Sequence, residues 1–320
     1  MTAATRKVNS SPGRSWRLLA VTVSLLVAAI GCSNARGTGP PGIATSPLPA
    51  EKSPCPVRDD LLVIAGENPF DARLWQVELC SGQVLDIGKA GRMSVVAVGG
   101  DMVAVSAAPS TVDQVFWLGP DGLVPLLPEG APAGRSPSVS DRGAVLYDSA
   151  DMQSQTVNLV REGKVAALWR SQRSPSFSSF TPDGGVVVGV LPLEIGGPSS
   201  DPEGPTLEFL DADLRPLRTV SVPLPTILGM AVDPRTGRIY LGGGTEVAGL
   251  ILDPAGTVIG TLPRGWVVNT ISASERQLLL TRDGVLARLL IAEDASAQSQ
   301  KPQVIVLPES IGPVGWAVRP

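Results

Sequence analysis

Two segments of the chain repeat one local pattern, an alternating strand, a turn and a second strand. They are SPSFSSFTPDGGVVVGV at 174–190 and ILGMAVDPRTGRIYLGG at 227–243, and in each the turn contains proline and ends in glycine. Weaker copies begin near Met93, Ser136 and Trp266, so that successive copies start 43, 38, 53 and 39 residues apart. A short-stranded unit that recurs about every 40 to 50 residues cannot bury its apolar faces alone, so the copies must pack on one another.

Each copy continues with a third and a fourth strand, as in TVNLVREG and KVAALWRSQ. Four strands in a unit of this length are typical of a propeller blade. The first unit, which begins at LLVIAGE, supplies only three strands, and the C-terminal segment GPVGWAVRP (312–320) has the form of the missing innermost strand. Joining that segment to the first unit closes the ring and removes the open sheet edges. We therefore predict an all-β fold, a β-propeller of six four-stranded blades over 55–320; the alternative is a seven-bladed or irregular propeller.

The phrases AVDPRTGRIYL and FTPDGGVVV resemble the repeats of NHL, YVTN and TolB-like propellers. The resemblance extends over most of 57–320 and implies the propeller fold. These patterns mainly encode a strand, a turn and a strand, so they say little about chemistry.

The N-terminus has the three parts of a secretory signal peptide. A positive start precedes an apolar run at 18–30, which is too short for the roughly 20 residues of a membrane-spanning helix. The run ends in Ala-Ile-Gly-Cys, which resembles the lipobox of bacterial lipoproteins. The resemblance implies that 1–31 is removed and that Cys32 carries the lipid, palmitate included, that holds the protein on the extracytoplasmic face of the cell membrane. An ordinary secreted protein and an uncleaved anchor are the alternatives.

After Cys32, the stretch to residue 54 is rich in Pro, Gly, Ser, Thr and Ala, and we expect it to be a flexible tether. Export to an oxidising compartment makes Cys55 and Cys80 an obvious disulfide pair. Such a bond would stabilise the fold by about 3 to 4 kcal/mol on the chain-entropy model. Two unpaired thiols are the alternative.

Composition excludes several kinds of function. With 26 basic and 30 acidic residues the chain is acidic, which argues against a nucleic-acid partner. The chain contains no histidine, so triads that use histidine and His-ligated zinc are excluded. Many aspartates stand beside proline or glycine, where turn chemistry alone explains them: Asp121, Asp183, Asp233, Asp253 and Asp283.

These observations favour a non-enzymatic binding scaffold, without assigned catalytic residues, metal or cofactor, for an envelope protein or an anionic ligand. The alternative is a metal-dependent hydrolase or lactonase, since some propeller enzymes hold a divalent cation at the channel mouth with carboxylates and amides. Against it, the inner strands supply only Asn269 and small residues, namely Ser94, Ser138 and Ser176. We expect the tryptophans on or beside strands to pack between blades rather than stack on a sugar: Trp75, Trp117, Trp169, Trp266 and Trp316.

Strand direction sorts the connections between the two faces of the ring. The blade-to-blade loops share a face with the loops between second and third strands, including the long loop at 191–205 and the glycine-rich loop at 242–246. Since long loops on a rigid scaffold often carry binding function, we expect the interaction surface on this face. The same face receives a recurrent arginine, which predicts a ring that binds anions: Arg92, Arg135, Arg173 and Arg264. Solvated loop residues, or partners of acidic neighbours, are the simpler explanation of these arginines.

Overall fold

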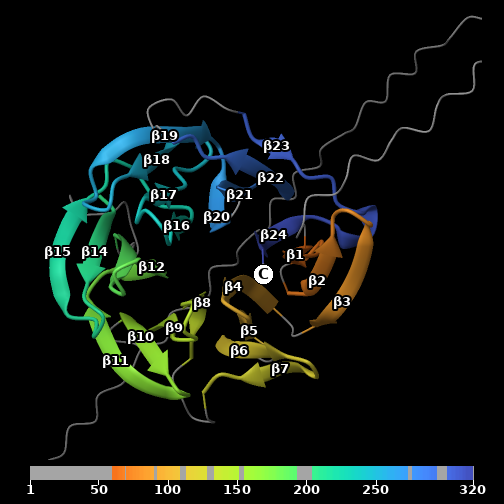
Figure 1. The fold of residues 1–320 in the computed structure, drawn as a ribbon, viewed down its shortest axis with the longest axis horizontal. Coiled ribbons are helices and arrows are strands. Elements are labelled where there is room, and N and C mark those ends of the chain that lie inside the picture. Colours follow the sequence, from red (N-terminus) through yellow and green to blue (C-terminus); the bar gives the residue numbers. More distant parts are fainter. Residues whose placement is uncertain are drawn as a thin grey trace, which may run out of the picture. The chain divides into compact units, whose positions relative to one another are not determined.

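The computed structural model describes residues 60–68, 70–89, 92–108, 113–127, 133–150, 155–192, 204–272, 276–293 and 301–319. The chain divides into two units, Met1–Glu51 and Lys52–Pro320, and all described residues belong to the second. In that unit, six four-stranded antiparallel sheets stand around a centre as the blades of a β-propeller (Figure 1). The predicted fold class, blade number and strand number are confirmed.

The first three blades follow one another along the chain, and each is given from its innermost to its outermost strand. Blade 1 contains β24 (Val314–Val318), β1 (Asp60–Ala65), β2 (Arg73–Glu78) and β3 (Gln83–Lys89). Blade 2 contains β4 (Arg92–Gly99), β5 (Met102–Ala108), β6 (Gln114–Gly119) and β7 (Gly122–Pro125). Blade 3 contains β8 (Arg135–Val139), β9 (Val145–Ala150), β10 (Gln155–Arg161) and β11 (Lys164–Ser171).

The other three blades have the same order. Blade 4 contains β12 (Ser174–Phe180), β13 (Val186–Leu191), β14 (Thr206–Leu210) and β15 (Pro216–Ser221). Blade 5 contains β16 (Met230–Val232), β17 (Ile239–Leu241), β18 (Ala248–Leu252) and β19 (Val258–Arg264). Blade 6 contains β20 (Val267–Ser272), β21 (Gln277–Arg282), β22 (Val285–Leu290) and β23 (Gln303–Val304), and a short 3-10 helix (Glu309–Ile311) leads from it to β24.

The last strand of the chain closes the ring. Strand β24 pairs antiparallel with β1, with Leu62 opposite Val318 and Val63 opposite Ala317. A side chain of the same strand reaches the next blade, because the indole Nε1 of Trp316 donates a hydrogen bond to the carbonyl oxygen of Val96 at 3.0 Å. The predicted completion of blade 1 by the C-terminal segment is therefore confirmed.

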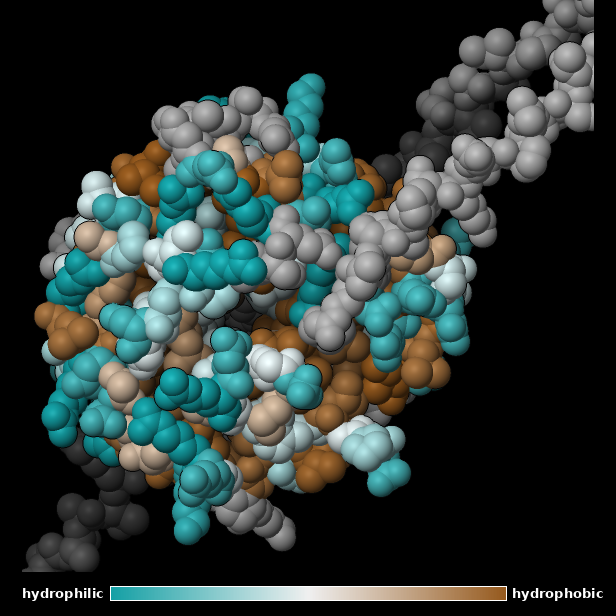
Figure 2. Space-filling view, viewed as in Figure 1, coloured by the Kyte–Doolittle hydropathy of each residue, from teal (hydrophilic) through white to brown (hydrophobic). Residues whose placement is uncertain are grey.

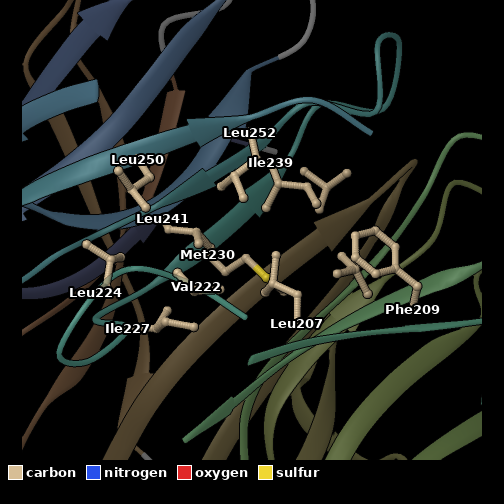
Figure 3. Close-up of a cluster of buried hydrophobic side chains, with 12 residues drawn as sticks. Leu207, Phe209, Val222, Leu224, Ile227, Met230, Ile239, Leu241, Leu250 and Leu252 are labelled. Atoms are coloured by element: carbon tan, nitrogen blue, oxygen red, sulfur yellow. The ribbon is translucent and has the colours of Figure 1, made fainter. Parts of the chain in front are cut away.

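The core lies between blades rather than within one of them. Each pair of neighbouring blades shares a cluster of buried apolar side chains. Between blades 4 and 5, Leu207 and Phe209 of one sheet face Ile239 and Leu241 of the next (Figure 3). Because both faces of a blade are covered, a middle strand such as β13 is buried over most of its length and its sequence is almost continuously apolar.

The tryptophans and the turn aspartates have the structural roles expected of them. The five tryptophans of the described residues all pack in or against the clusters between blades. Asp233 accepts hydrogen bonds from the Arg235 N–H at 2.9 Å and the Thr236 hydroxyl at 2.7 Å, and Asp253 accepts one from the Thr257 N–H at 2.8 Å. These carboxylates form turns of the kind that local sequence predicts.

A charge on the closing strand should destabilise the whole ring. Ala317 of β24 is 0% exposed and Val306 is 86% exposed, so Val306→Asp is a matched control for Ala317→Asp. Burying an unpaired carboxylate at Ala317 should lower the free energy of unfolding by about 3 kcal/mol or more, and the control should change it by less than about 0.5 kcal/mol. Urea unfolding followed by tryptophan fluorescence measures both. Equal midpoints for the two variants would show that closure by β24 contributes little.

Candidate functional site

The two ends of the ring differ in which residues reach them. We call the end where the innermost strands begin, at Arg92, Arg135, Ser174 and Val267, the loop end. The opposite end, where these strands finish, carries the tight turns at 140–144, 181–185 and 233–238, and we call it the turn end. Because the strands of a blade alternate in direction, a side chain's place along its strand fixes the end at which it lies.

A cavity of about 810 Å³ occupies the centre of the ring. All six innermost strands contribute to its wall, and it extends into the turns at 140–144 and 181–184, so it lies toward the turn end. Hydrophilic residues gather around a hollow near the centre of the ring in Figure 2. This position was not predicted, since sequence reasoning placed the interaction surface at the loop end.

The wall of the cavity is neutral and its mouth is charged. The innermost strands supply apolar, aromatic and hydroxyl side chains, with Phe177, Trp316 and Ser138 among them. The charged lining residues lie in turns or at a strand end: Asp141, Arg142, Arg161, Glu162 and Asp183. A ligand group that passes the mouth therefore meets no ionised side chain on the described strands.

Two charged side chains at the mouth, Arg161 and Asp183, form hydrogen bonds within the protein. The Arg161 guanidinium donates to the carbonyl oxygen of Ala212 at 2.7 Å and lies 3.7 Å from the Asp213 carboxylate. Asp183 accepts hydrogen bonds from the Thr181 hydroxyl at 2.5 Å and the Gly185 N–H at 3.3 Å, which lower the pKa of its carboxyl. Arg142 is exposed and makes no ion pair with any residue that the structure describes, so its charge is available to a partner.

Two polar side chains in the cavity wall are buried without a hydrogen bond. Neither the amide nitrogen nor the amide oxygen of Asn269 has a partner among the described residues, and the same holds for the hydroxyl of Ser178. Asn269 is 4% exposed and is the residue at which the pairing of β20 with β21 shifts register. A buried unpaired amide costs about 1 to 3 kcal/mol, so a ligand that drew these groups into hydrogen bonds would recover free energy. Of the polar inner-strand residues picked from the sequence, Asn269 and Ser138 line the cavity.

Three of the four predicted anion-binding arginines lie in strands of three different blades, Arg173 lies in the connection between blades 3 and 4, and none of the four lines the cavity. Arg135 donates from Nε to a carboxylate oxygen of Asp148 at 2.9 Å, so its charge is balanced by a buried acid. Arg173 donates to the carbonyl oxygen of Gly204 at 2.6 Å and to the Thr206 hydroxyl at 3.3 Å, which ties the start of blade 4 to the loop before β14.

The other two arginines of this set lie at strand ends. Arg264 ends β19, is exposed and has no ion-pair partner within the described ranges. Arg92 begins β4, and its side chain lies outside the described part of the structure. The ring of four arginines stays a prediction.

Burial dominates the acid-base behaviour of Asp148. Loss of hydration raises the pKa of its carboxyl to about 7, although the Arg135 guanidinium opposes the rise by attraction and by its hydrogen bond. The carboxyl is therefore poised to change charge near neutral pH. The register of β9 with β10 places Asp148 opposite Val157, which belongs to the buried apolar cluster between blades 3 and 4.

The cysteine and metal predictions fall largely on residues that the structure does not describe. Cys32, Cys55 and the tether lie outside the described residues. Cys80 follows β2 and its sulfur is not free, but its pairing with Cys55 stays a prediction. Within the described ranges no group of three or more His, Cys, Asp or Glu residues could hold a metal ion. The described helical structure includes nothing with the length and hydropathy of a membrane span.

By its fold and its site, the described chain is a six-bladed β-propeller with a central cavity that lies toward the turn end. No protein-family model and no curated protein matches it. Among solved structures it is similar to the nidogen/laminin complex, with a TM-score of 0.59 and 11% identity over 81% of this chain and 97% of that chain. It is also similar to a protein of unknown function from Bacteroides caccae, with a TM-score of 0.56 and 12% identity over 81% and 98% of the two chains. At such identities the likeness shows the fold alone.

The raised pKa of Asp148 predicts a specific pH dependence of stability. The folded-state pKa is about 7 and the ordinary pKa of an aspartate carboxyl is 3.8, so between these values the folded protein holds a proton that the unfolded chain has released. The free energy of unfolding should therefore decrease as the pH rises from about 4 to 7, with a slope of up to about 1.4 kcal/mol per pH unit from this group. Above pH 7 the contribution of this group is fully lost.

The variant Asp148→Asn should remove this contribution. Urea unfolding at several pH values between 4 and 7 measures the difference between variant and unchanged protein, from which the titration of all other groups cancels. Asp183→Asn is the control, because the pKa of Asp183 is shifted downward and its removal should leave the Asp148 slope in place. Identical slopes for Asp148→Asn and the unchanged protein would contradict the assignment.

Proposed function

We propose that this protein is a lipid-anchored binding protein of the extracytoplasmic face of the cell membrane, and that its propeller binds a partner through the central cavity at the turn end. The observation that carries the proposal is the cavity itself, which has a neutral wall and a charged mouth. A binding site of this kind takes up a neutral group in its interior and fixes orientation through the charges at its rim.

An envelope protein is the partner class that suits the mouth best. Arg142, Asp141 and Glu162 are exposed there and form no ion pairs within the described part of the chain. Charges of both signs around an apolar centre are typical of a protein interface with a polar rim. One structure similar in fold is itself a complex of two proteins, nidogen and laminin.

The N-terminal sequence supports the proposed lipid anchor. The apolar run before Cys32 and the Ala-Ile-Gly-Cys sequence resemble a lipobox, and the tether that follows gives a propeller room to reach partners from the membrane surface. Lipid at Cys32 would keep the protein on the same membrane as an envelope partner, which raises their effective concentration.

The anchor predicts the behaviour of a Cys32→Ala variant. Without the thiol no diacylglyceryl group can be attached, so we expect complete loss of incorporated labelled palmitate and transfer of the protein out of the detergent-rich phase in Triton X-114 partition. Ser33→Ala changes the neighbouring residue and should leave both properties unchanged. Label retained on Cys32→Ala would show that the lipid, if any, is attached elsewhere.

The binding surface can be mapped in cells by placing the photoreactive residue p-benzoylphenylalanine at chosen sites. At Arg142, in the cavity mouth, we expect a discrete crosslinked product with one envelope protein. The control position is Leu217, which is 67% exposed on the outermost strand of blade 4 and should yield no such product. The same products from both positions, or none from Arg142, would contradict binding at the turn end.

A further inference from the structure

Two arginines end strands at the loop end of the ring, where blade 5 connects to blade 6. Arg264 ends β19 and Arg282 ends β21. The guanidinium carbon of Arg282 lies 4.6 Å from the centroid of the Trp266 ring, two residues after Arg264. Between them Gly265 brings the backbone so close that an added Cβ would lie 3.3 Å from Cδ and 3.8 Å from Nη1 of Arg282.

The stacking fixes one of the two guanidinium groups in advance. Trp266 is 7% exposed and belongs to the cluster between blades 5 and 6, so the indole under Arg282 is itself rigidly held. Stacking on an indole face is favourable for a guanidinium and leaves its N–H edge open to form two parallel hydrogen bonds. Less conformational entropy is then lost when an anion binds.

Neither arginine is neutralised within the described part of the chain. Ion pairs are found at other arginines, but at neither Arg264 nor Arg282, and both side chains are exposed. Two acidic residues are close to this junction. Glu246 belongs to the loop whose Thr245 oxygen lies 3.4 Å from the Cβ position of Gly265, and Asp283 follows Arg282 in the chain. Both are exposed and neither forms an ion pair with a described residue.

We propose that Arg264 and Arg282 form a binding site for one oxyanion, a phosphate or a carboxylate group of a ligand, at the loop end of the blade 5 to blade 6 junction. This site is a local pair: Arg264 belongs to the predicted ring of four arginines, and Arg282 was not picked from the sequence. Two guanidinium groups that converge on one oxyanion provide charge-assisted hydrogen bonds, the strong class of such bonds. The site is at the opposite end of the ring from the cavity and extends the proposed binding function by a second contact of stated chemistry.

Titration of the purified full-length protein in detergent tests the site directly. The Nε–Hε resonances of isotope-labelled arginines are followed by NMR as inorganic phosphate or acetate is added at low ionic strength. We expect saturable shifts of the Arg264 and Arg282 resonances with a single common Kd and no saturable shift at Arg170, which is exposed on the outermost strand of blade 3. Phosphate binding more tightly than acetate assigns a phosphate ligand, and the reverse order assigns a carboxylate.

Variants separate a binding role from a structural one. Arg264→Gln and Arg282→Gln should each weaken binding by about tenfold or more, Arg282→Lys should weaken it less because the charge remains, and Arg170→Gln, on the outermost strand of blade 3, should leave it unchanged. Glu246→Gln should tighten binding, because it removes a competing negative charge.

Shifts that never saturate, or equal Kd values in the unchanged protein and both Gln variants, would overturn the proposal. Crosslinking from Arg142 is unaffected by these changes, so failure here is distinguishable from failure of the cavity as a binding site.

Discussion

The backbone ladder between β24 and β1 is the interaction on which the rest of this propeller depends. Within the unit 52–320 this ladder joins the first and the last described strands. It gives blade 1 its innermost strand and covers the edge of β1. Residues of the same strand then serve both neighbours: Ala317 is buried in the cluster between blades 6 and 1, and Trp316 packs toward blade 2 and bonds to its backbone. The cavity depends on this ladder too, since Trp316 and Val318 form part of its wall.

The innermost strands that form the closed ring are irregular, and this irregularity affects the hydrogen bonding of polar residues near the axis. In five of the six blades the register shifts where the innermost strand pairs with its neighbour, and such bulges sharpen the twist of a sheet. A bulge turns a side chain out of regular alternation, and at Asn269 this leaves a buried amide unpaired. The cavity is thus bounded by strands whose local irregularity is a by-product of forming a tight ring.

How much of this could be read from the sequence depends on how local each feature is. The turns around Asp233 and Asp253 are encoded by adjacent residues, and so the blades, their strand number and the role of the C-terminal segment were predictable. The pairing of Arg135 with Asp148 and the stacking of Arg282 on Trp266 both depend on the register between neighbouring strands, which local sequence does not fix. The position of the cavity was missed for a different reason: loop length indicated the loop end, whereas the shape of the channel depends on how six innermost strands converge.

The position of β1 has a mechanical consequence for a protein held by its N-terminal segment. A pulling force on the chain before Asp60 enters the propeller at the first residue of β1, and β1 is an interior strand flanked by β24 on one edge and β2 on the other. It can be extracted only by rupture of two ladders, whereas a terminal strand at a sheet edge would detach after rupture of one. The C-terminal strand therefore adds a second ladder of backbone hydrogen bonds that opposes extraction of β1.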